Sequence, residues 1–261
     1  MKKFFQYLAF LWVVVLTMTS CTTDDNSGTS AILLKKLTAV SFGTNAEYNF
    51  TYKGTKLSQV TFTVNNQTNG NGYYKYTYTN DLITEISRYH SNGHLSEKTT
   101  FSYDSSNRLT EALKLVFETS FGSKKVFSHN LNGTVTVTTF GGNLIAQNTL
   151  SDIVETYHFT NGEISQKDYD SNTLAYSINY AYDNANHPTQ NVTGLKALKL
   201  YDFISDGLFG MNHNLLEQNT YDANGNLEHT VSYQGDYNQD NYPTALYTAD
   251  GQFQYQFTYF K

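Results

Sequence analysis

The chain has 261 residues and a formal net charge of −6, and it contains 22 Tyr, 17 Phe, 2 Pro and 1 Cys. The acidic excess disfavours nucleic acid and anionic lipid headgroups as general partners, so we expect no nucleic-acid binding. A single cysteine excludes a disulfide framework, and abundant aromatic residues with little proline are typical of long, uninterrupted strands.

The first 20 residues resemble the signal peptide of a bacterial lipoprotein. A short basic start precedes a nearly continuous apolar run over residues 4–16, and Met18-Thr19-Ser20-Cys21 resembles a lipobox. Met18 departs from the family, which usually has Leu at this position. A transmembrane anchor is the alternative, but the run is shorter than the ~20 residues that a spanning helix needs. The resemblance implies lipidation of Cys21 and anchoring in the outer membrane.

Residues 21–35 are expected to form the lipidated cysteine and a flexible tether. Lys2 and Lys3 leave with the signal, so 15 basic residues remain against 23 acidic ones and the net charge becomes −8. Asp24-Asp25 resembles the acidic export signal of surface-exposed lipoproteins in Bacteroides-type bacteria, and a solvated linker is the alternative. We therefore expect an outer-membrane lipoprotein at the cell surface, with a periplasm-facing orientation as the alternative.

Residues 36–261 are predicted to form a single domain of degenerate repeats. In the unit over residues 221–233, an aromatic residue ends one strand, an Asp/Asn/Gly turn follows, and Leu227 opens an alternating strand. Asn, Asp and Gly tolerate the positive φ of tight turns. Copies of the unit predict an all-β, antiparallel up-and-down meander of roughly sixteen strands of ordinary length, closing into a barrel or a strongly curled sheet.

One segment departs from strand periodicity. Between residues 195 and 209, apolar residues recur in steps of three and four, and Thr193 and Gly210 are suited to cap the ends. The pattern predicts one short helix, about 195–209, that acts as a plug or lid of the barrel. A helix that closes one barrel end for packing alone is the alternative. The candidate ligand-binding residues on this segment are Leu198, Tyr201, Phe203 and Phe209.

No catalytic motif stands out, and we expect no enzymatic activity, no cofactor and no metal. His90 and His94 flank a hairpin turn with no obvious third ligand, whereas zinc sites need three or four ligands. Carboxylate pairs such as Asp168 and Asp170 include turn positions, where Asp is expected for backbone reasons. The many tyrosines suit either core packing or an amphipathic cavity lining, and both interpretations stay open.

Three Tyr-Asp pairs carry a family resemblance. Tyr103-Asp104, Tyr182-Asp183 and Tyr221-Asp222, each followed by a polar turn ending at Leu or Pro, resemble YD repeats of the Rhs type. With the lipobox, the acidic tether and the late helical segment, residues 35–261 resemble a family of Bacteroides-type surface lipoproteins of unknown function. That resemblance implies a porin-like antiparallel barrel, and some members carry a provisional lipid-binding label. It implies no catalytic residues.

The resemblance concerns shape and not insertion into a bilayer. The non-aromatic face of most predicted strands is Thr, Ser, Gln, Asn and Lys, whereas a membrane barrel needs an outward apolar band. The leading hypothesis is a non-enzymatic lipoprotein that binds an apolar or amphipathic, lipid-like ligand in its interior. The alternatives are a glycan- or host-surface-binding protein that uses exposed aromatic residues such as Tyr237, and an Rhs-like shell protein.

Overall fold

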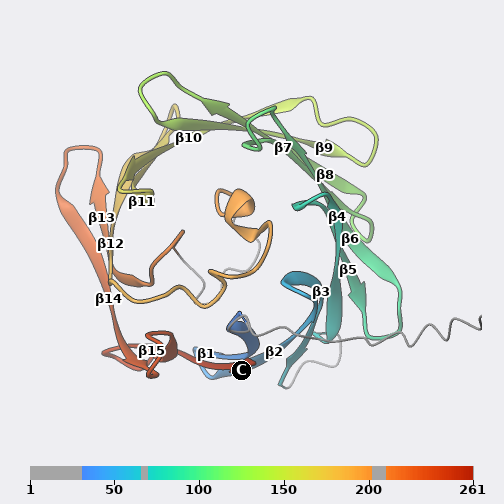
Figure 1. Ribbon diagram of the computed structural model, residues 1–261. Coiled ribbons are helices and arrows are strands. Elements are labelled where there is room, and N and C mark those ends of the chain that lie inside the picture. The colour runs from blue at the N-terminus through green and yellow to red at the C-terminus, as the bar shows by residue number, and fades with distance from the viewer. Residues whose placement is uncertain (1–30, 66–69, 202–209, 261) are drawn as a thin grey trace, which may run out of the picture. The chain divides into compact units, whose positions relative to one another are not determined.

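The described part of the chain folds into one closed β-barrel. The computed structural model describes residues 31–65, 70–201 and 210–260, and Ala31–Lys261 form a compact unit. Sixteen strands follow one another around a ring (Figure 1). The strands are β1 (Leu33–Ser41), β2 (Thr44–Lys53), β3 (Lys56–Val64), β4 (Gly72–Thr79), β5 (Leu82–His90), β6 (Leu95–Tyr103), β7 (Leu109–Val116), β8 (Phe121–His129), β9 (Val135–Asn143), β10 (Thr149–Thr160), β11 (Glu163–Asp170), β12 (Ala175–Tyr182), β13 (Leu215–Asp222), β14 (Leu227–Tyr237), β15 (Pro243–Thr248) and β16 (Phe253–Phe260).

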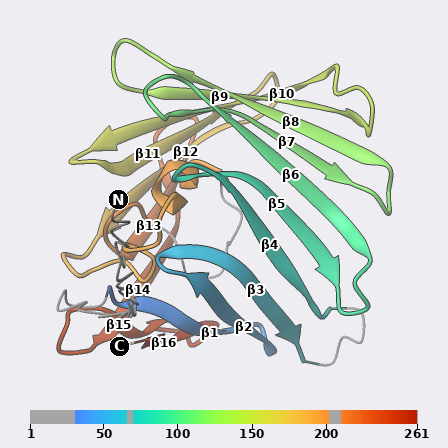
Figure 2. The same ribbon diagram turned by 45° about the vertical axis from the view of Figure 1, so that its right-hand side comes forward.

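Pairing between the first and last strands closes the barrel. Each strand pairs antiparallel with its neighbours in the sequence, and β1 joins β16 through pairs such as Leu37↔Phe257 and Ala39↔Tyr255. Strands β4 to β8 run side by side at a slant in Figure 2, as the stagger of a closed sheet requires. The predicted all-β up-and-down meander is therefore confirmed. β1 begins at Leu33, inside the segment expected to be a tether.

Aspartate side chains close the turns of the Tyr-Asp units. Oδ1 of Asp104, Asp183 and Asp222 accepts a hydrogen bond from the backbone N–H two residues later, at 2.9, 3.0 and 2.9 Å. This arrangement is the Asx turn, in which the side chain takes the place of a backbone carbonyl. Gly225 in the last of these turns has a φ of 82°, which glycine adopts at little cost. The aspartate of each unit thus serves the turn.

Tyrosines at the ends of four strands tie neighbouring strands together. Each of these terminal tyrosines donates its hydroxyl proton to a backbone carbonyl near the start of the preceding strand. The bonds run from Tyr52 to Leu34 (2.7 Å), Tyr103 to Ile83 (2.6 Å), Tyr182 to Ile164 (2.8 Å) and Tyr259 to Pro243 (2.7 Å). Burial raises the pKa of all four hydroxyls, so they stay protonated donors at neutral pH.

The helix expected over residues 195–209 is much shorter where the structure describes it. Only Leu195–Leu198 form a helical turn, η1, and it is of the 3-10 type. Thr193, the expected cap, pairs its hydroxyl with that of Thr55 at 2.7 Å, and Gly194 has a left-handed φ of 81°. Residues 199–201 continue as a turn and a bend, so the α-helical prediction is wrong for residues 195–201.

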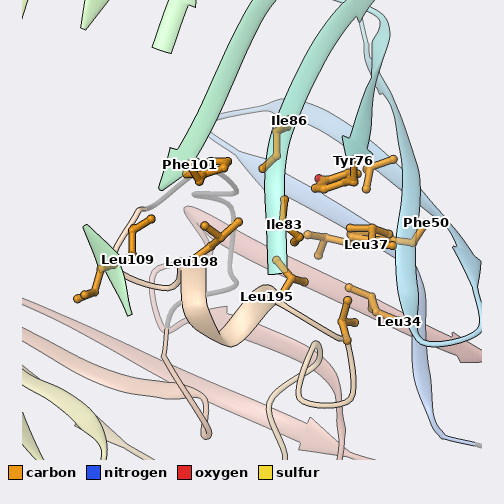
Figure 3. Packing of buried hydrophobic residues seen from close by; sticks show 14 of the residues in the cluster. Leu34, Leu37, Phe50, Tyr76, Ile83, Ile86, Phe101, Leu109, Leu195 and Leu198 are labelled. Carbon is orange, nitrogen blue, oxygen red and sulfur yellow. The ribbon is translucent and has the colours of Figure 1, made fainter. Parts of the chain in front are cut away.

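Residues of η1 pack into the hydrophobic core at the inner face of the wall. Leu195 and Leu198 are both buried, and they lie among Ile83, Phe101 and Leu109 from β5, β6 and β7 (Figure 3). Burying a leucine side chain stabilises a fold by about 1.5–3 kcal/mol. The segment therefore occupies the interior, as predicted, although it is not an α-helix. None of the helical turns in the described residues is long and apolar enough to cross a lipid bilayer.

We expect Tyr103→Phe to lower the free energy of unfolding by about 0.5–1.5 kcal/mol, because it removes one hydrogen bond and keeps the ring. Tyr247→Phe is the matched control, since the Tyr247 hydroxyl makes no hydrogen bond within residues 31–65, 70–201 and 210–260. Urea unfolding of the three proteins measures the difference. Equal midpoints for Tyr103→Phe and Tyr247→Phe would contradict the stabilising role of the terminal tyrosines.

Candidate functional site

Inward and outward side chains alternate along the strands. In β16, Tyr255 and Phe257 are buried, whereas Gln254, Gln256 and Thr258 between and beside them are exposed. This alternation places aromatic residues on the inner wall and polar residues on the outer face, as the sequence predicts. The space inside the wall is therefore the place to search for a ligand site.

The described parts of the segment that joins β12 to β13, residues 183–201 and 210–214, run through this space (Figure 1). We call it the inner connection. Buried Glu163 holds its far end by accepting hydrogen bonds from the backbone N–H groups of residues 211–213, at 2.7, 2.7 and 3.0 Å. Asp183 links the two ends by accepting the N–H of Asn214 at 2.9 Å. Glu163 thus fixes the inner connection to the wall, and Asp183 holds its two ends together.

A cavity of about 260 Å³ lies between the inner connection and the wall strands β10 to β13. Its walls are mainly aromatic and aliphatic, with a few polar groups, as is typical of small-molecule sites. The lining residues are Tyr157, Ile164, Lys167, Tyr169, Ile178, Tyr180, Tyr182, Lys199, Leu200, Gly210, Met211 and Gln218. We call this space the inner cavity.

Lys199 brings an amino group from the inner connection to the inner cavity. Its Nζ donates to the carbonyl of Gly210 and lies 3.1 Å from both ring nitrogens of His187. The backbone N–H of Thr189 points to Nδ1 of His187 at 3.2 Å, which favours a neutral ring with Nδ1 as acceptor. Burial lowers the pKa of Lys199 to about 7, so its amino group is partly neutral at neutral pH.

A row of three charged residues crosses the wall beside the inner cavity. In this β8–β11 row, Glu155 lies 3.6 Å from Nζ of Lys125 and 3.2 Å from Nζ of Lys167, and it accepts the hydroxyl proton of Tyr157 at 3.0 Å. Burial raises the pKa of Glu155, but the two lysines and the hydrogen bonds outweigh burial, and the pKa is lowered. Glu155 is therefore ionised at neutral pH.

The β8–β11 row borders a second cavity, of about 270 Å³, which we call the outer cavity. Lys125, Glu155 and Tyr169 line it together with Ile153 and Leu174. Leu174 lies in the turn between β11 and β12, and both aliphatic side chains are exposed. The outer cavity is thus reached from the end of the barrel that carries this turn.

A second row of the same composition crosses β5 to β7. Glu97 lies 3.1 Å from Nη1 of Arg88 and 2.8 Å from Nζ of Lys114. All three residues line a cavity of about 130 Å³, and Tyr201 of the inner connection forms part of its wall. The β5–β7 row therefore also faces the interior.

The structure separates the predicted ligand-binding residues. Leu198 is fully buried in the core, where it packs the inner connection against the wall. Tyr201 lines the 130 Å³ cavity and contacts Phe101 edge to face, with ring centroids 5.2 Å apart. Phe203, Phe209 and the lipidation site Cys21 lie outside the described residues.

Sequence reasoning missed the charged residues of the inner wall. Glu155 precedes Tyr157 by two positions, and Lys167 precedes Tyr169 by two. Residues two apart in a strand share a face, so both charges stand on the aromatic, inward face. That pattern could have identified the β8–β11 row, whereas Lys199 in the inner connection had no comparable signal.

The histidines and turn carboxylates do not assemble a metal site. The rings of His90 and His94 are stacked 6.4 Å apart, and His90 pairs with Glu118. Asp168 pairs with His158 at 2.7 Å. Across residues 31–65, 70–201 and 210–260, no group of three or more His, Cys, Asp or Glu residues could hold a metal ion.

Comparison with solved structures identifies the fold. No family model matches the sequence, and a search of curated proteins finds no match. A porin-like protein from Bacteroides uniformis ATCC 8492 is similar with a TM-score of 0.56 and 11% identity, over 88% of this chain and 97% of that chain. A porin-like protein from Bacteroides vulgatus ATCC 8482 is similar with a TM-score of 0.55 and 13% identity, over 88% and 99%. The barrel has a porin-like fold. This confirms the shape that the resemblance implied, and at such identities the likeness concerns the fold alone.

The lowered pKa of Lys199 predicts a specific pH dependence of stability. The folded state releases the proton near pH 7, whereas the unfolded state keeps it until about pH 10.5, so stability rises with pH between these values. We expect the urea concentration at the unfolding midpoint of the wild type to increase from pH 7 to pH 9. In Lys199→Met, the part of this increase that comes from the Lys199 amino group should be absent. Lys53→Met, at an exposed lysine that ends β2, is the control and should keep it. Parallel pH curves for the wild type and Lys199→Met would contradict the assignment.

Proposed function

We propose that this porin-like barrel is a non-enzymatic outer-membrane lipoprotein at the cell surface that binds an apolar or amphipathic, lipid-like small molecule in its interior. The observation that carries the proposal is the inner cavity of about 260 Å³, walled by side chains such as Ile178, Tyr180 and Leu200. Transfer of apolar ligand surface from water into such a space is favourable. The proposal includes no cofactor and no nucleic acid.

The lipoprotein assignment and the finer family assignment rest on the sequence. The lipobox-like residues 18–21 support an acyl anchor at Cys21, which would tie the barrel to the outer membrane. The Asx turns at Asp104, Asp183 and Asp222 support a common repeat unit of the YD type. We therefore propose membership of the Bacteroides-type surface lipoproteins with YD repeats.

We propose that the barrel lies in water and that the acyl anchor at Cys21 attaches it to the membrane. Ion pairs of Lys36 with Glu47 and of Lys98 with Glu85, each at 2.6 Å, occupy positions that alternate with the inward residues. A cationic side chain at the lipid-facing midplane of a membrane barrel costs roughly 2–4 kcal/mol. The charged outer face thus supports a tethered domain.

Glycan binding is the second candidate function. The rings of Tyr73 and Tyr89 stack 5.0 Å apart, and Nζ of Lys75 lies 5.5 and 5.4 Å from their centroids. Two parallel aromatic rings beside an ammonium group favour contact with a polar sugar ring of a glycan. Tyr237, the aromatic residue expected to make such contacts, is 36% exposed, but its hydroxyl donates to Asp183 at 2.5 Å and so supports the inner connection. A shell role is less favoured, because the ring of described strands leaves no open sheet edge.

Native mass spectrometry of residues 22–261, the mature chain without its lipidated cysteine, tests the interior ligand. We expect a co-purifying apolar mass that organic extraction releases and that Ile178→Asn removes, because an amide group in the inner cavity lacks apolar contacts. Ser177→Asn is the matched control, since Ser177 neighbours Ile178 in β12 but faces the opposite side. A protein that carries no ligand and takes up none from a lipid extract would sink the proposal.

The anchor is tested by labelling with an alkynyl fatty acid. We expect the wild type to incorporate the label and to fractionate with the outer membrane, and Cys21→Ser to incorporate none and to leave that fraction. Incorporation of label by Cys21→Ser would count against lipidation at Cys21.

A further inference from the structure

Two rows of charged residues on the inner wall each carry more positive than negative charge, although the chain as a whole has a net charge of −6. The β8–β11 row combines two lysines with one glutamate, and the β5–β7 row combines an arginine and a lysine with one glutamate. Because one carboxylate neutralises one cation, each row retains one uncompensated positive charge. An unpaired cation in a cavity with apolar walls attracts a counter-charge, so the rows favour an anion in the interior.

Within the β8–β11 row, Lys125 is the cation with the weaker protein contacts. Lys167 lies 3.2 Å from Glu155 and also 5.0 and 4.3 Å from the ring centroids of Tyr157 and Tyr169, and its side chain is 15% exposed. Lys125 lies 3.6 Å from Glu155, which exceeds hydrogen-bond length, and its side chain is 31% exposed. The Lys125 ammonium can therefore take another anionic partner while Lys167 keeps Glu155.

The row stands between two spaces with apolar walls. Lys125 lines the outer cavity with Ile153, and Lys167 lines the inner cavity with Ile178 and Leu200. Tyr169 borders both cavities. A cation with apolar surface beside it is the arrangement that recognises a molecule with a negative head and an apolar tail.

We propose that the interior ligand is an anionic amphiphile. Its head group, a carboxylate or a phosphate, binds the ammonium groups of Lys125 and Lys167, and its apolar tail lies against Ile178 and Leu200 in the inner cavity. The inference rests on the proposed function and names the chemical class of its ligand. Charge-assisted hydrogen bonds to the two ammonium groups supply the preference for an anion over a neutral molecule of equal length.

Calorimetric titration of the mature chain, which contains every strand of the barrel, tests this inference with dodecanoate, dodecyl phosphate and dodecanol. We expect at least one of the two anions to bind about tenfold more tightly than dodecanol. Tighter binding of dodecanoate than of dodecyl phosphate assigns a fatty-acid-like ligand, and the reverse order assigns a phosphate head group. Either order supports the inference.

Matched variants locate the anion site. Lys125→Met is expected to remove the preference for the anion and to keep the affinity for dodecanol, which also shows that the cavity is intact. Lys124→Met is the control, because Lys124 is the outward neighbour of Lys125 and lies 5.1 Å from the ring centroid of Phe140. Glu155→Gln is expected to strengthen the preference, since it removes the competing carboxylate.

Equal affinity for all three molecules, or a preference that survives Lys125→Met, would overturn the anionic head group and leave the proposed function in place. If Lys125→Met does not bind dodecanol, Lys167→Met replaces it in the same comparison. If the wild type binds none of the three molecules, the proposed function fails, and this inference fails with it.

Discussion

A ring of sixteen strands encloses more space than inward side chains of the wall alone can fill. The inner connection meets part of this requirement. Leu195 and Leu198 join the core cluster on the side of β5 to β7, and Glu163 and Asp183 hold the ends of the connection. On the side of β10 to β13 the inner connection does not fill the space up to the wall, and a cavity of about 260 Å³ remains. The proposed site thus follows from how a wide barrel is filled by its own chain.

The tyrosines of the wall have two roles. The terminal tyrosines, such as Tyr103 and Tyr182, donate to backbone carbonyls of the preceding strand and so hold the ring together. Other tyrosines of the wall, such as Tyr169 and Tyr180, line the inner cavity, as Tyr182 also does. Both interpretations of the aromatic composition, core packing and cavity lining, therefore apply to different members of one repeated pattern.

The two faces of the wall differ in how their cations and carboxylates are paired, as well as in hydrophobicity. On the outer face, several cations pair one to one with carboxylates, as Lys36 does with Glu47 and Lys98 does with Glu85. On the inner face, two cations share one carboxylate in each charge row, as Lys125 and Lys167 share Glu155. The excess cation of each row gives the space beside it an electrostatic preference for anions, although the chain is acidic. On the outer face, the paired charges suit water.

Local sequence determined the strands, the turns and the order of pairing, because alternation and Asp/Asn/Gly turns act over a few residues and consecutive strands pair with one another. Only the tertiary structure decided the pairing of β1 with β16, the 3-10 form of η1 and the position of Lys199, since each depends on contacts between distant segments. In the described part of the predicted helix, residues 195–201, the apolar spacing reflected the burial of Leu195 and Leu198, which a 3-10 turn inside a barrel also provides. The sequence pattern shows that the residues of the charge rows occupy inward-facing strand positions. Only closure of the barrel directs these positions toward a common interior.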